Sequence, residues 1–224
     1  MTLTDAKEKL LNAALAHVVF DGWTETCFEA AARDVGLTDA EARAACPRGA
    51  VDLAAAYHKR GDQQMLAAFE AADVSGLRYS EKVAELVWLR LKQSDRETVR
   101  RGMALFSLPQ HAAEGSALIW GTADLIWNTL GDTSDDVNWY SKRAILSGVF
   151  GSSVLFWLGD TSEGDSATRA FIDRRIANVM QFEKFKSRVR SNPAFKPLIS
   201  LGEGLLSGIR APRSGRDDLP GRWP

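Results

Sequence analysis

The sequence predicts an all-α protein with a three-helix head, a larger helical body and a C-terminal amphipathic helix. Apolar residues recur at the spacing that places them on one face of a helix, and almost no segment alternates as a strand does. Capping residues, glycines and prolines divide this pattern into segments of helical length. The expected units are a head over residues 1–46, a body over 47–192, an amphipathic helix over 193–210 and a disordered tail over 211–224.

The head contains three short predicted helices. Asp5 with Glu8, and Thr38 with Glu41, have the spacing of capping boxes, and Pro47 cuts the third helix short. The expected helices span residues 5–22, 24–36 and 38–46. This is the outline of a helix-turn-helix bundle.

The body contains longer predicted helices, separated by clear stop signals. They are expected within residues 49–71, 80–92, 94–109, 112–130, 131–162 and 167–190. The tetrapeptide GDTS occurs twice, at 131–134 and 159–162. Gly131 and Gly159 suit the left-handed position after a helix, while the Asp, Thr and Ser that follow can cap the next helix. The repeat therefore predicts helix ends and not a phosphate-binding loop.

Composition is that of an ordinary globular protein. The chain has 224 residues, a formal net charge of −1 and a pI near 6.3, so the overall charge favours no strongly charged partner. Cys27 and Cys46 are expected to be free, buried thiols. The first residues contain acidic side chains and no long apolar core, so neither a signal peptide nor a transit peptide is predicted.

A three-helix head before a larger helical body is the layout of TetR-type transcriptional regulators, so DNA binding is the first function to consider. The recognition helix would lie in LTDAEARAAC, where Asp39 and Glu41 are opposed only by Arg43. Residues 1–60 carry nine acidic and seven basic side chains, which cannot drive counterion release from DNA. The sequence therefore argues against nucleic acid as a partner.

No catalytic motif is present. The three histidines lie far apart in the sequence, and metalloprotease, CxxC, dinucleotide-binding and Walker patterns are missing. His111 and Glu114 share a helical face, but a metal site needs further ligands, and a helix-start histidine beside a solvated carboxylate explains the pair. A serine triad leaves no signature in one sequence, and nothing favours one. The prediction is a protein without enzymatic activity, metal or cofactor.

Apolar residues are concentrated in the body. The run from Ala144 to Gly159 has no charge and is interleaved with Ser and Gly, yet it is too short to span a bilayer. Two interpretations stay open: a tightly packed core, or one wall of an apolar pocket between helices. The candidate pocket residues are Trp88, Met103, Phe106, Trp120, Val149, Phe150 and Leu155.

The C-terminal part is cationic and amphipathic. Residues 184–216 carry eight basic side chains and one acidic one. An apolar stripe lies within them and consists of Leu198, Ile199, Leu201, Leu205, Leu206 and Ile209. Three glycines in this stretch weaken an isolated helix, so it needs a surface on which to fold. That surface is either an anionic membrane or a protein surface, from the chain's own body or a partner subunit.

Several long segments resemble the ninth Coq protein family of ubiquinone biosynthesis, over roughly residues 5 to 210. They are HVVFDGWTETCFEAAARDVGL, CPRGAVDL, ALFSLPQHAAEG, IWNTLGDTSDDVNWYSKRAILSGVFGSSVLFWLGDTS and FIDRRIANVMQFEKFKSRV. The resemblance implies a TetR-like fold, no enzymatic activity and a body pocket for an isoprenoid quinone or phospholipid. It further implies a membrane-associating last helix, a homodimer, and work with the membrane-associated hydroxylase of demethoxyubiquinone.

The resemblance also implies a partner surface around Asn138, Trp139 and Tyr140, with acidic neighbours at Asp124 and Asp136. A Trp-Tyr pair in the first turn of a helix independently has the composition of an interface hot spot. The alternative is that both rings fold into the core.

Together these inferences predict a lipid-binding accessory protein that presents a ubiquinone precursor to its hydroxylase. The main rival is a ligand-responsive DNA-binding repressor, and an enzyme is a distant third. Because no transit peptide is seen, the expected location is the bacterial cytoplasm, peripheral to the inner face of the plasma membrane.

Overall fold

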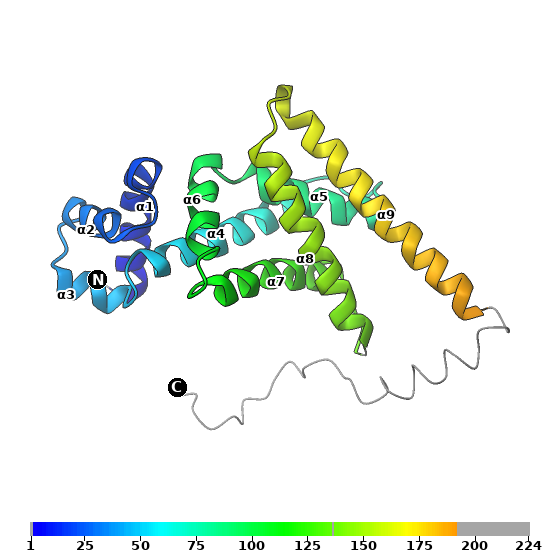
Figure 1. Ribbon diagram of the computed structural model, residues 1–224, viewed down its shortest axis with the longest axis horizontal. Helices are drawn as coiled ribbons and strands as arrows, with labels where there is room; N and C mark the ends of the chain where they lie inside the picture. Colours follow the sequence, from blue (N-terminus) through cyan, green and yellow to red (C-terminus); the bar gives the residue numbers. More distant parts are fainter. Residues whose placement is uncertain (1, 136, 192–224) are drawn as a thin grey trace.

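The computed structural model describes residues 2–135 and 137–191, which form helices and turns (Figure 1). The helices are α1 (Leu3–Asp21), α2 (Glu25–Asp34), α3 (Asp39–Ala45), α4 (Ala50–Ala71), α5 (Tyr79–Lys92), α6 (Arg96–Phe106), α7 (Ala112–Thr129), α8 (Val137–Leu158) and α9 (Ser166–Ser191). A 3₁₀ turn at Glu163–Asp165 joins α8 to α9. The all-α prediction is confirmed.

Two hydrophobic clusters organise the helices. One gathers residues of α1, α2, α3 and the first turn of α4, around Leu10, Phe28 and Leu53. The other gathers the second half of α4 with α5, α7, α8 and α9, around Met65 and Leu86. Helix α4 runs from the first cluster into the second and contributes residues to both (Figure 1).

The helix starts in the head follow the capping chemistry of the sequence, with one shift. Thr38 and Glu41 form the predicted capping box at α3. At α1 the box is formed by Thr2 and Asp5, so the expected start near Asp5 is wrong and the helix begins at Leu3. Thr2–Asp5 and Asp5–Glu8 have the same spacing, and the earlier pair adds most of a turn of helix.

The two GDTS copies have different conformations. Gly131 has φ 74° and ends α7, and the amide of Asp132 donates to Trp127 O in the pattern of a Schellman motif. Gly159 lacks a positive φ, so that prediction is wrong: the amides of Gly159 and Asp160 donate to Phe156 O and Trp157 O, three residues back, and α8 ends in a tight turn.

Asp160 performs the capping role predicted for the second copy. Its carboxylate accepts from the amides of Ser162 and Thr168, each at 2.8 Å, and so fixes the start of α9. Helix α6 is likewise capped by Asp95, which accepts from the amide of Thr98 at 2.8 Å, so the helix begins at Arg96 and not at residue 94 as expected.

Cys27 and Cys46 are free and buried, as predicted. Burial raises the pKa of both thiols to about 11, so both are protonated at neutral pH. Within residues 2–135 and 137–191, no helix combines the length and hydropathy of a membrane span. The expected amphipathic helix 193–210, with Leu198, Ile199, Leu201, Leu205, Leu206 and Ile209, lies outside the described residues, as does the tail 211–224.

Candidate functional site

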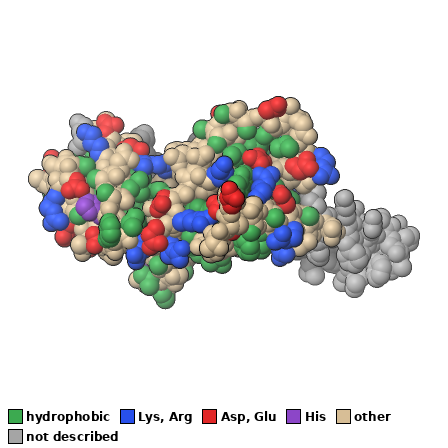
Figure 2. Space-filling model, turned by 90° about the horizontal axis from the view of Figure 1, so that it is seen from above, with side chains coloured by type: hydrophobic (Ala, Val, Ile, Leu, Met, Phe, Trp, Pro, Cys, Tyr) green, Lys and Arg blue, Asp and Glu red, His purple; other side chains and the backbone are tan. Residues whose placement is uncertain are grey.

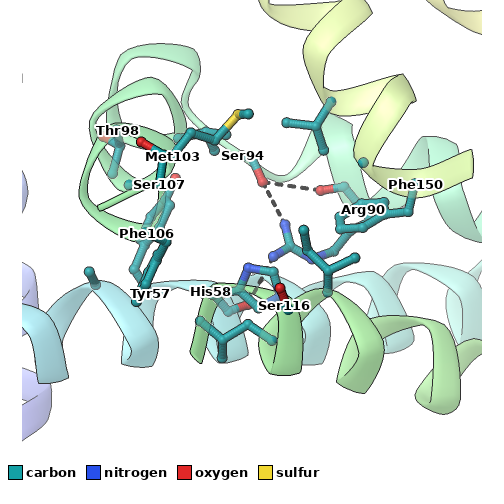
Figure 3. Close-up of a pocket in the computed structure, with 18 of the residues that line it drawn as sticks. Tyr57, His58, Arg90, Ser94, Thr98, Met103, Phe106, Ser107, Ser116 and Phe150 are labelled. Atoms are coloured by element: carbon teal, nitrogen blue, oxygen red, sulfur yellow. Dashed lines mark hydrogen bonds between the residues drawn. The ribbon is translucent and has the colours of Figure 1, made fainter. Parts of the chain in front are cut away.

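A cavity of about 320 Å³ lies in the body between α4, α5, α6, α7 and α8 (Figure 3). Its walls are mostly apolar, with a small polar group on one side. The lining residues include Trp23, Tyr57, His58, Arg90, Leu91, Ser94, Val99, Gly102, Met103, Phe106, Ser107, Gly115, Ser116, Leu118, Ile119, Phe150, Gly151, Val154 and Trp157. A concave, apolar site with few polar groups is typical of small-molecule binding.

Close helix packing at glycine shapes this cavity. At Gly115 of α7, a Cβ atom would lie 2.7 Å from Phe106 Cβ, so glycine allows the end of α6 to approach α7. At Gly151 of α8, a Cβ atom would meet nothing within 4 Å. The first glycine brings two walls together, and the second leaves space open beside the cavity.

The head contributes to the cavity through Trp23, which lies between α1 and α2. Its indole Nε1 donates to Thr98 O at 3.3 Å, and its ring lies 5.9 Å from that of Tyr57. Because Trp23 and Tyr57 both line the cavity, the cavity extends to the connection between head and body.

The polar wall is built around an ion pair between α4 and α5. Arg90 Nε donates to Asp62 Oδ1 at 2.7 Å, and only 6% of the Arg90 side chain is exposed. The two guanidinium Nη atoms donate to His58 O at 2.9 Å and to Ser94 Oγ at 2.8 Å. A Cβ atom at Gly61 would lie 2.5 Å from Arg90 Nη1, so the guanidinium rests directly on the backbone of α4.

His58 is the second polar group of this wall. Its Nε2 lies 2.9 Å from Thr122 Oγ1, and that hydroxyl donates to Asp62 Oδ1 at 2.9 Å. Thr122 Oγ1 also lies 3.3 Å from Leu118 O, and the Leu118 backbone is a further hydrogen-bond partner of the His58 ring.

Burial, reinforced by the charge of Arg90, lowers the pKa of His58 to about 4, although Asp62 acts in the opposite direction. The imidazole is therefore neutral at neutral pH. The 3.8 Å between His58 Nε2 and Asp62 Oδ2 is accordingly no ion pair under these conditions.

The structure divides the predicted pocket residues into two groups. Met103, Phe106 and Phe150 line the cavity. Trp88, Trp120, Val149 and Leu155 do not: Val149 is buried in the body core, and 62% of Leu155 is exposed. On α8 the cavity residues are Phe150, Gly151, Val154 and Trp157, so the helical phase turns Leu155 away.

Sequence reasoning missed the polar wall. Arg90 lies four residues after Leu86 and beside Leu91 on the buried face of α5, and Asp62 lies four residues after His58 on α4. A charged residue at a core position of an amphipathic helix was the available signal.

Two of the predicted partner residues, Asp124 and Trp139, contact a second buried arginine, Arg143 of α8. Its guanidinium lies 4.0 Å from the centre of the Trp139 ring and forms ion pairs with Asp124 and Asp132. Lys142 Nζ donates to Asp132 at 2.6 Å. Burial would raise the pKa of Asp132, but hydrogen bonds from Lys142, Ser134 and Arg143 outweigh it and lower the pKa below the ordinary value.

Asn138, Trp139 and Tyr140 are each half-buried, which lies between the two expectations for the rings. The Trp139 ring lies 6.0 Å from Trp120 and 4.8 Å from Tyr140, edge to face with the tyrosine. Asp124 is directed to Arg143, while Asp136 lies outside the described residues.

The head offers little to DNA at the recognition position. Arg43 of α3 is engaged by Glu25 and lies 3.7 Å from Asp39. Acidic and basic side chains are interspersed on the face of the head seen in Figure 2.

Within the part of the chain that the structure describes, no group of three or more His, Cys, Asp or Glu could hold a metal ion. Glu114, which the sequence places on one helical face with His111, forms an ion pair with Arg48 at 2.7 Å.

Comparisons with known proteins indicate similarity to proteins of ubiquinone biosynthesis. The COQ9 family model matches residues 112–183, from the start of α7 into α9. The probable ubiquinone biosynthesis protein coq9, mitochondrial, of Dictyostelium discoideum is 28% identical over 193 residues, covering 83% of this chain and 63% of that protein. The ubiquinone biosynthesis protein COQ9, mitochondrial, of Rattus norvegicus is 26% identical over 211 residues, covering 91% of this chain and 65% of that protein. The chain thus spans less than two thirds of the length of these relatives.

Among solved structures, the crystal structure of the TetR transcriptional regulator from Nitrosomonas europaea ATCC 19718 matches with a TM-score of 0.63 at 18% identity. The match covers 76% of this chain and 95% of that protein. At this identity the likeness shows the fold, which is TetR-like as predicted.

The expected location in the bacterial cytoplasm, at the inner face of the plasma membrane, is wrong. The relatives from Dictyostelium discoideum, Rattus norvegicus and Schizosaccharomyces pombe are all named as mitochondrial proteins. Because the chain matches only part of the first two, its opening residues carry no information about targeting.

The family model, the curated relatives and the TetR-like fold confirm the resemblance that the sequence motifs indicated, and this chain is similar to the COQ9 family of ubiquinone biosynthesis proteins.

Proposed function

We propose that the chain is a non-enzymatic accessory protein of ubiquinone biosynthesis. It binds an isoprenoid quinone precursor in the body cavity, associates with a membrane surface and presents the ligand to the demethoxyubiquinone hydroxylase. The observation that carries the proposal is the mostly apolar cavity, two walls of which come from α7 and α8, within the region that matches the COQ9 family model. The names of the curated relatives support a role in ubiquinone biosynthesis.

The size of the cavity fits the head of such a lipid. An engineered apolar cavity of about 150 Å³ holds benzene. The cavity of about 320 Å³ has room for a substituted ring and the first part of a chain. The remainder of an isoprenoid tail would extend out of the cavity, which suits a protein that takes its ligand from a membrane and returns it there.

The membrane and partner surfaces belong to the same proposal. The apolar stripe of residues 198–209 and its basic flanks supply the membrane contact, and deletion of residues 198–210 should abolish binding to anionic liposomes while the body stays folded. The half-buried Trp139 and Tyr140 supply the contact with the hydroxylase, because aromatic residues at an interface centre contribute most to affinity.

The decisive experiment fills the cavity from Gly151. The full chain is purified with its endogenous ligand, and the bound lipids are extracted and identified by mass spectrometry. We expect quinone or another isoprenoid lipid from the wild type and much less from Gly151→Leu, because the new side chain occupies the open space beside the cavity wall. Gly148→Leu is the matched control, since Gly148 is exposed on the same helix and does not line the cavity.

Equal isoprenoid recovery from both variants would contradict the proposal, as would a wild type that carries no such lipid. Phe150 and Leu155 provide a second pair. A polar residue at Phe150, which lines the cavity, should empty it. Leu155 is exposed to solvent, so the same change there should leave the bound lipid in place.

A further inference from the structure

We propose that Asp124 and Arg143 are positioning residues of the partner surface, which is formed by Asn138, Trp139 and Tyr140. Arg143 holds the Trp139 ring in place from inside the body, and Asp124 acts through Arg143 without contacting the partner. The proposal rests on the proposed function, because it divides the surface offered to the hydroxylase into residues that touch it and residues that support them. The resemblance to the family gave Asp124 only as an acidic neighbour of that surface.

Arg143 contacts Trp139 at both its ring and its backbone. The guanidinium carbon lies 4.0 Å from the centre of the ring, and Nη1 donates to Trp139 O at 3.2 Å. Only 1% of the Arg143 side chain is exposed, whereas Trp139 is half-buried. The cation therefore lies on the inner side of the ring, where it is shielded from water and a cation–π contact is strongest. One buried side chain thus fixes the first turn of α8 and the aromatic ring that this turn carries.

The guanidinium is itself held at all three nitrogen atoms. Nε donates to Asp124 Oδ1, Nη1 to Asp132 Oδ2 at 3.1 Å and Nη2 to Asn128 Oδ1 at 3.2 Å. Asp124 and Asn128 belong to α7, and Asp132 belongs to the turn that follows it. A planar guanidinium with these partners cannot rotate without breaking hydrogen bonds. The plane beneath the Trp139 ring is therefore set by α7, the neighbouring helix (Figure 1).

Both carboxylate oxygens of Asp124 are directed to side chains of the chain itself. Oδ1 accepts from Arg143 Nε, and Oδ2 accepts from Asn128 Nδ2 at 3.1 Å. Of the Asp124 side chain, 35% is exposed, which is enough for a cation of the partner to reach it. An exposed ion pair of that kind contributes little, whereas a buried arginine that loses a carboxylate is strongly destabilising. Asp124 therefore stays on Arg143 when the partner docks.

The orientation of Trp139 matters because its ring contacts the other aromatic residues of the surface. It lies 6.0 Å from the Trp120 ring of α7 and 4.8 Å from the Tyr140 ring, which it meets edge to face. Without its support the Trp139 ring would take several rotamers, and the partner would have to order it on binding. The cost of ordering one side chain corresponds to about a three- to tenfold loss of affinity.

The test is a double-mutant cycle with the full-length chain and the purified hydroxylase, with affinities measured by surface plasmon resonance. Asp124→Ala removes the carboxylate, and Arg143→Lys keeps the charge but loses the planar group that holds three partners and the ring at once. Each single variant should bind about three- to tenfold more weakly. The double variant should lose no more than about twofold beyond the weaker single variant, because both changes release the same ring. Asp124→Asn, which keeps the shape of the side chain, replaces Asp124→Ala if circular dichroism shows that the latter loses helix.

Fluorine NMR of the chain labelled with 5-fluorotryptophan separates positioning from a general loss of structure. The chain has seven tryptophans, and Trp139→Phe and Trp23→Phe identify the two signals that are compared. In free Asp124→Ala the Trp139 signal should shift or broaden, while the signal of Trp23 in the head stays in place. Asp52→Asn is the matched control, because Asp52 pairs with Arg48 at 2.6 Å at the start of α4, outside the partner surface. It should keep both the Trp139 signal and the wild-type affinity.

Each outcome decides a separate point. Losses of affinity that multiply in the double variant would show that Asp124 touches the partner directly and would overturn the proposal. Wild-type affinity in both single variants, or an unmoved Trp139 signal in Asp124→Ala, would overturn it as well, and all three results leave the partner surface standing. Trp139→Ala tests the surface itself and should lose at least about thirtyfold in affinity, the value of a hot-spot residue. If that variant keeps the wild-type affinity, the partner docks elsewhere, and the proposed contact with the hydroxylase fails together with the positioning roles.

Discussion

Arg90 and Arg143 are both buried in the body, but they differ in what surrounds their charge. Arg90 has a single carboxylate partner, Asp62, and its other hydrogen bonds go to uncharged oxygens beside the cavity. Arg143 pairs with two carboxylates, Asp124 and Asp132, and a second cation, Lys142, shares Asp132.

The difference separates two uses of one side chain. Arg90 has one carboxylate partner and lines the cavity, so its remaining N–H groups are available to a ligand. The Arg143 guanidinium is paired with two carboxylates, and the Trp139 ring lies over it with its centre at 4.0 Å. It therefore holds an aromatic surface in place and has little capacity left for a ligand.

Arg90→Met and Arg143→Met should show this difference in stability. Methionine preserves much of the aliphatic packing but leaves the carboxylates without their arginine. We expect Arg90→Met to lower the free energy of unfolding by about 3–5 kcal/mol, because Asp62 then has no cationic partner. Arg143→Met should cost less, about 1–3 kcal/mol, since Lys142 stays 2.6 Å from Asp132 and about a third of Asp124 is exposed. Urea unfolding at neutral pH measures both.

An Arg143→Met variant that is less stable than Arg90→Met would show that the lysine does not substitute for the arginine. Arg143 would then contribute more to stability than Arg90. Far-ultraviolet circular dichroism of both variants checks that each keeps its helices before the unfolding curves are compared.

The pH dependence of stability should come from the cavity side of the comparison. The pKa of His58 is about 4 in the folded state and about 6.5 when unfolded, so the unfolded state binds the proton first. Its contribution is fully present above pH 6.5 and is lost as the pH falls toward 4. Lowering the pH from 7 to 5 should therefore reduce the free energy of unfolding by about 2 kcal/mol through His58.

His58→Gln is the variant that isolates this effect. Glutamine keeps a donor for Thr122 but does not titrate, so the part of the pH dependence between pH 7 and pH 5 that belongs to His58 should vanish. Urea unfolding at both pH values measures the change. An unaltered slope in the variant would mean that His58 does not carry it.

Much of the fold could be predicted because its signals are local. The capping box of Thr38 and Glu41 and the left-handed Gly131 each depend on a few neighbouring residues. The errors were local choices between equal patterns. Thr2 and Asp5 have the spacing of Asp5 and Glu8, and only the conformation of the chain after α8 distinguishes Gly159 from Gly131.

The site could be predicted only in part because it is made by contacts between helices. The run 144–159 has no charged residues to mark its exposed side, so the sequence could not tell Phe150 in the cavity from Leu155 in solvent. Arg90 and Asp62 lie 28 residues apart and look like ordinary surface charges until α4 and α5 are packed together. Packing, and not periodicity, creates the polar wall.

The uncharged hydrogen-bond partners of the two arginines should contribute least to stability. Ser94→Ala removes the acceptor of Arg90 Nη1 in the cavity wall, whereas Asn128→Ala removes an acceptor 3.2 Å from Arg143 Nη2 on an exposed residue. We expect Ser94→Ala to cost about 1 kcal/mol, the usual net value of one hydrogen bond. Asn128→Ala should cost a few tenths of a kcal/mol, because water replaces an exposed partner and surface substitutions change stability little. Paired thermal and urea unfolding measures the difference. If the two variants lose the same stability, Ser94 is as well replaced by water as Asn128 is, and the polar wall is open to solvent rather than reserved for a ligand.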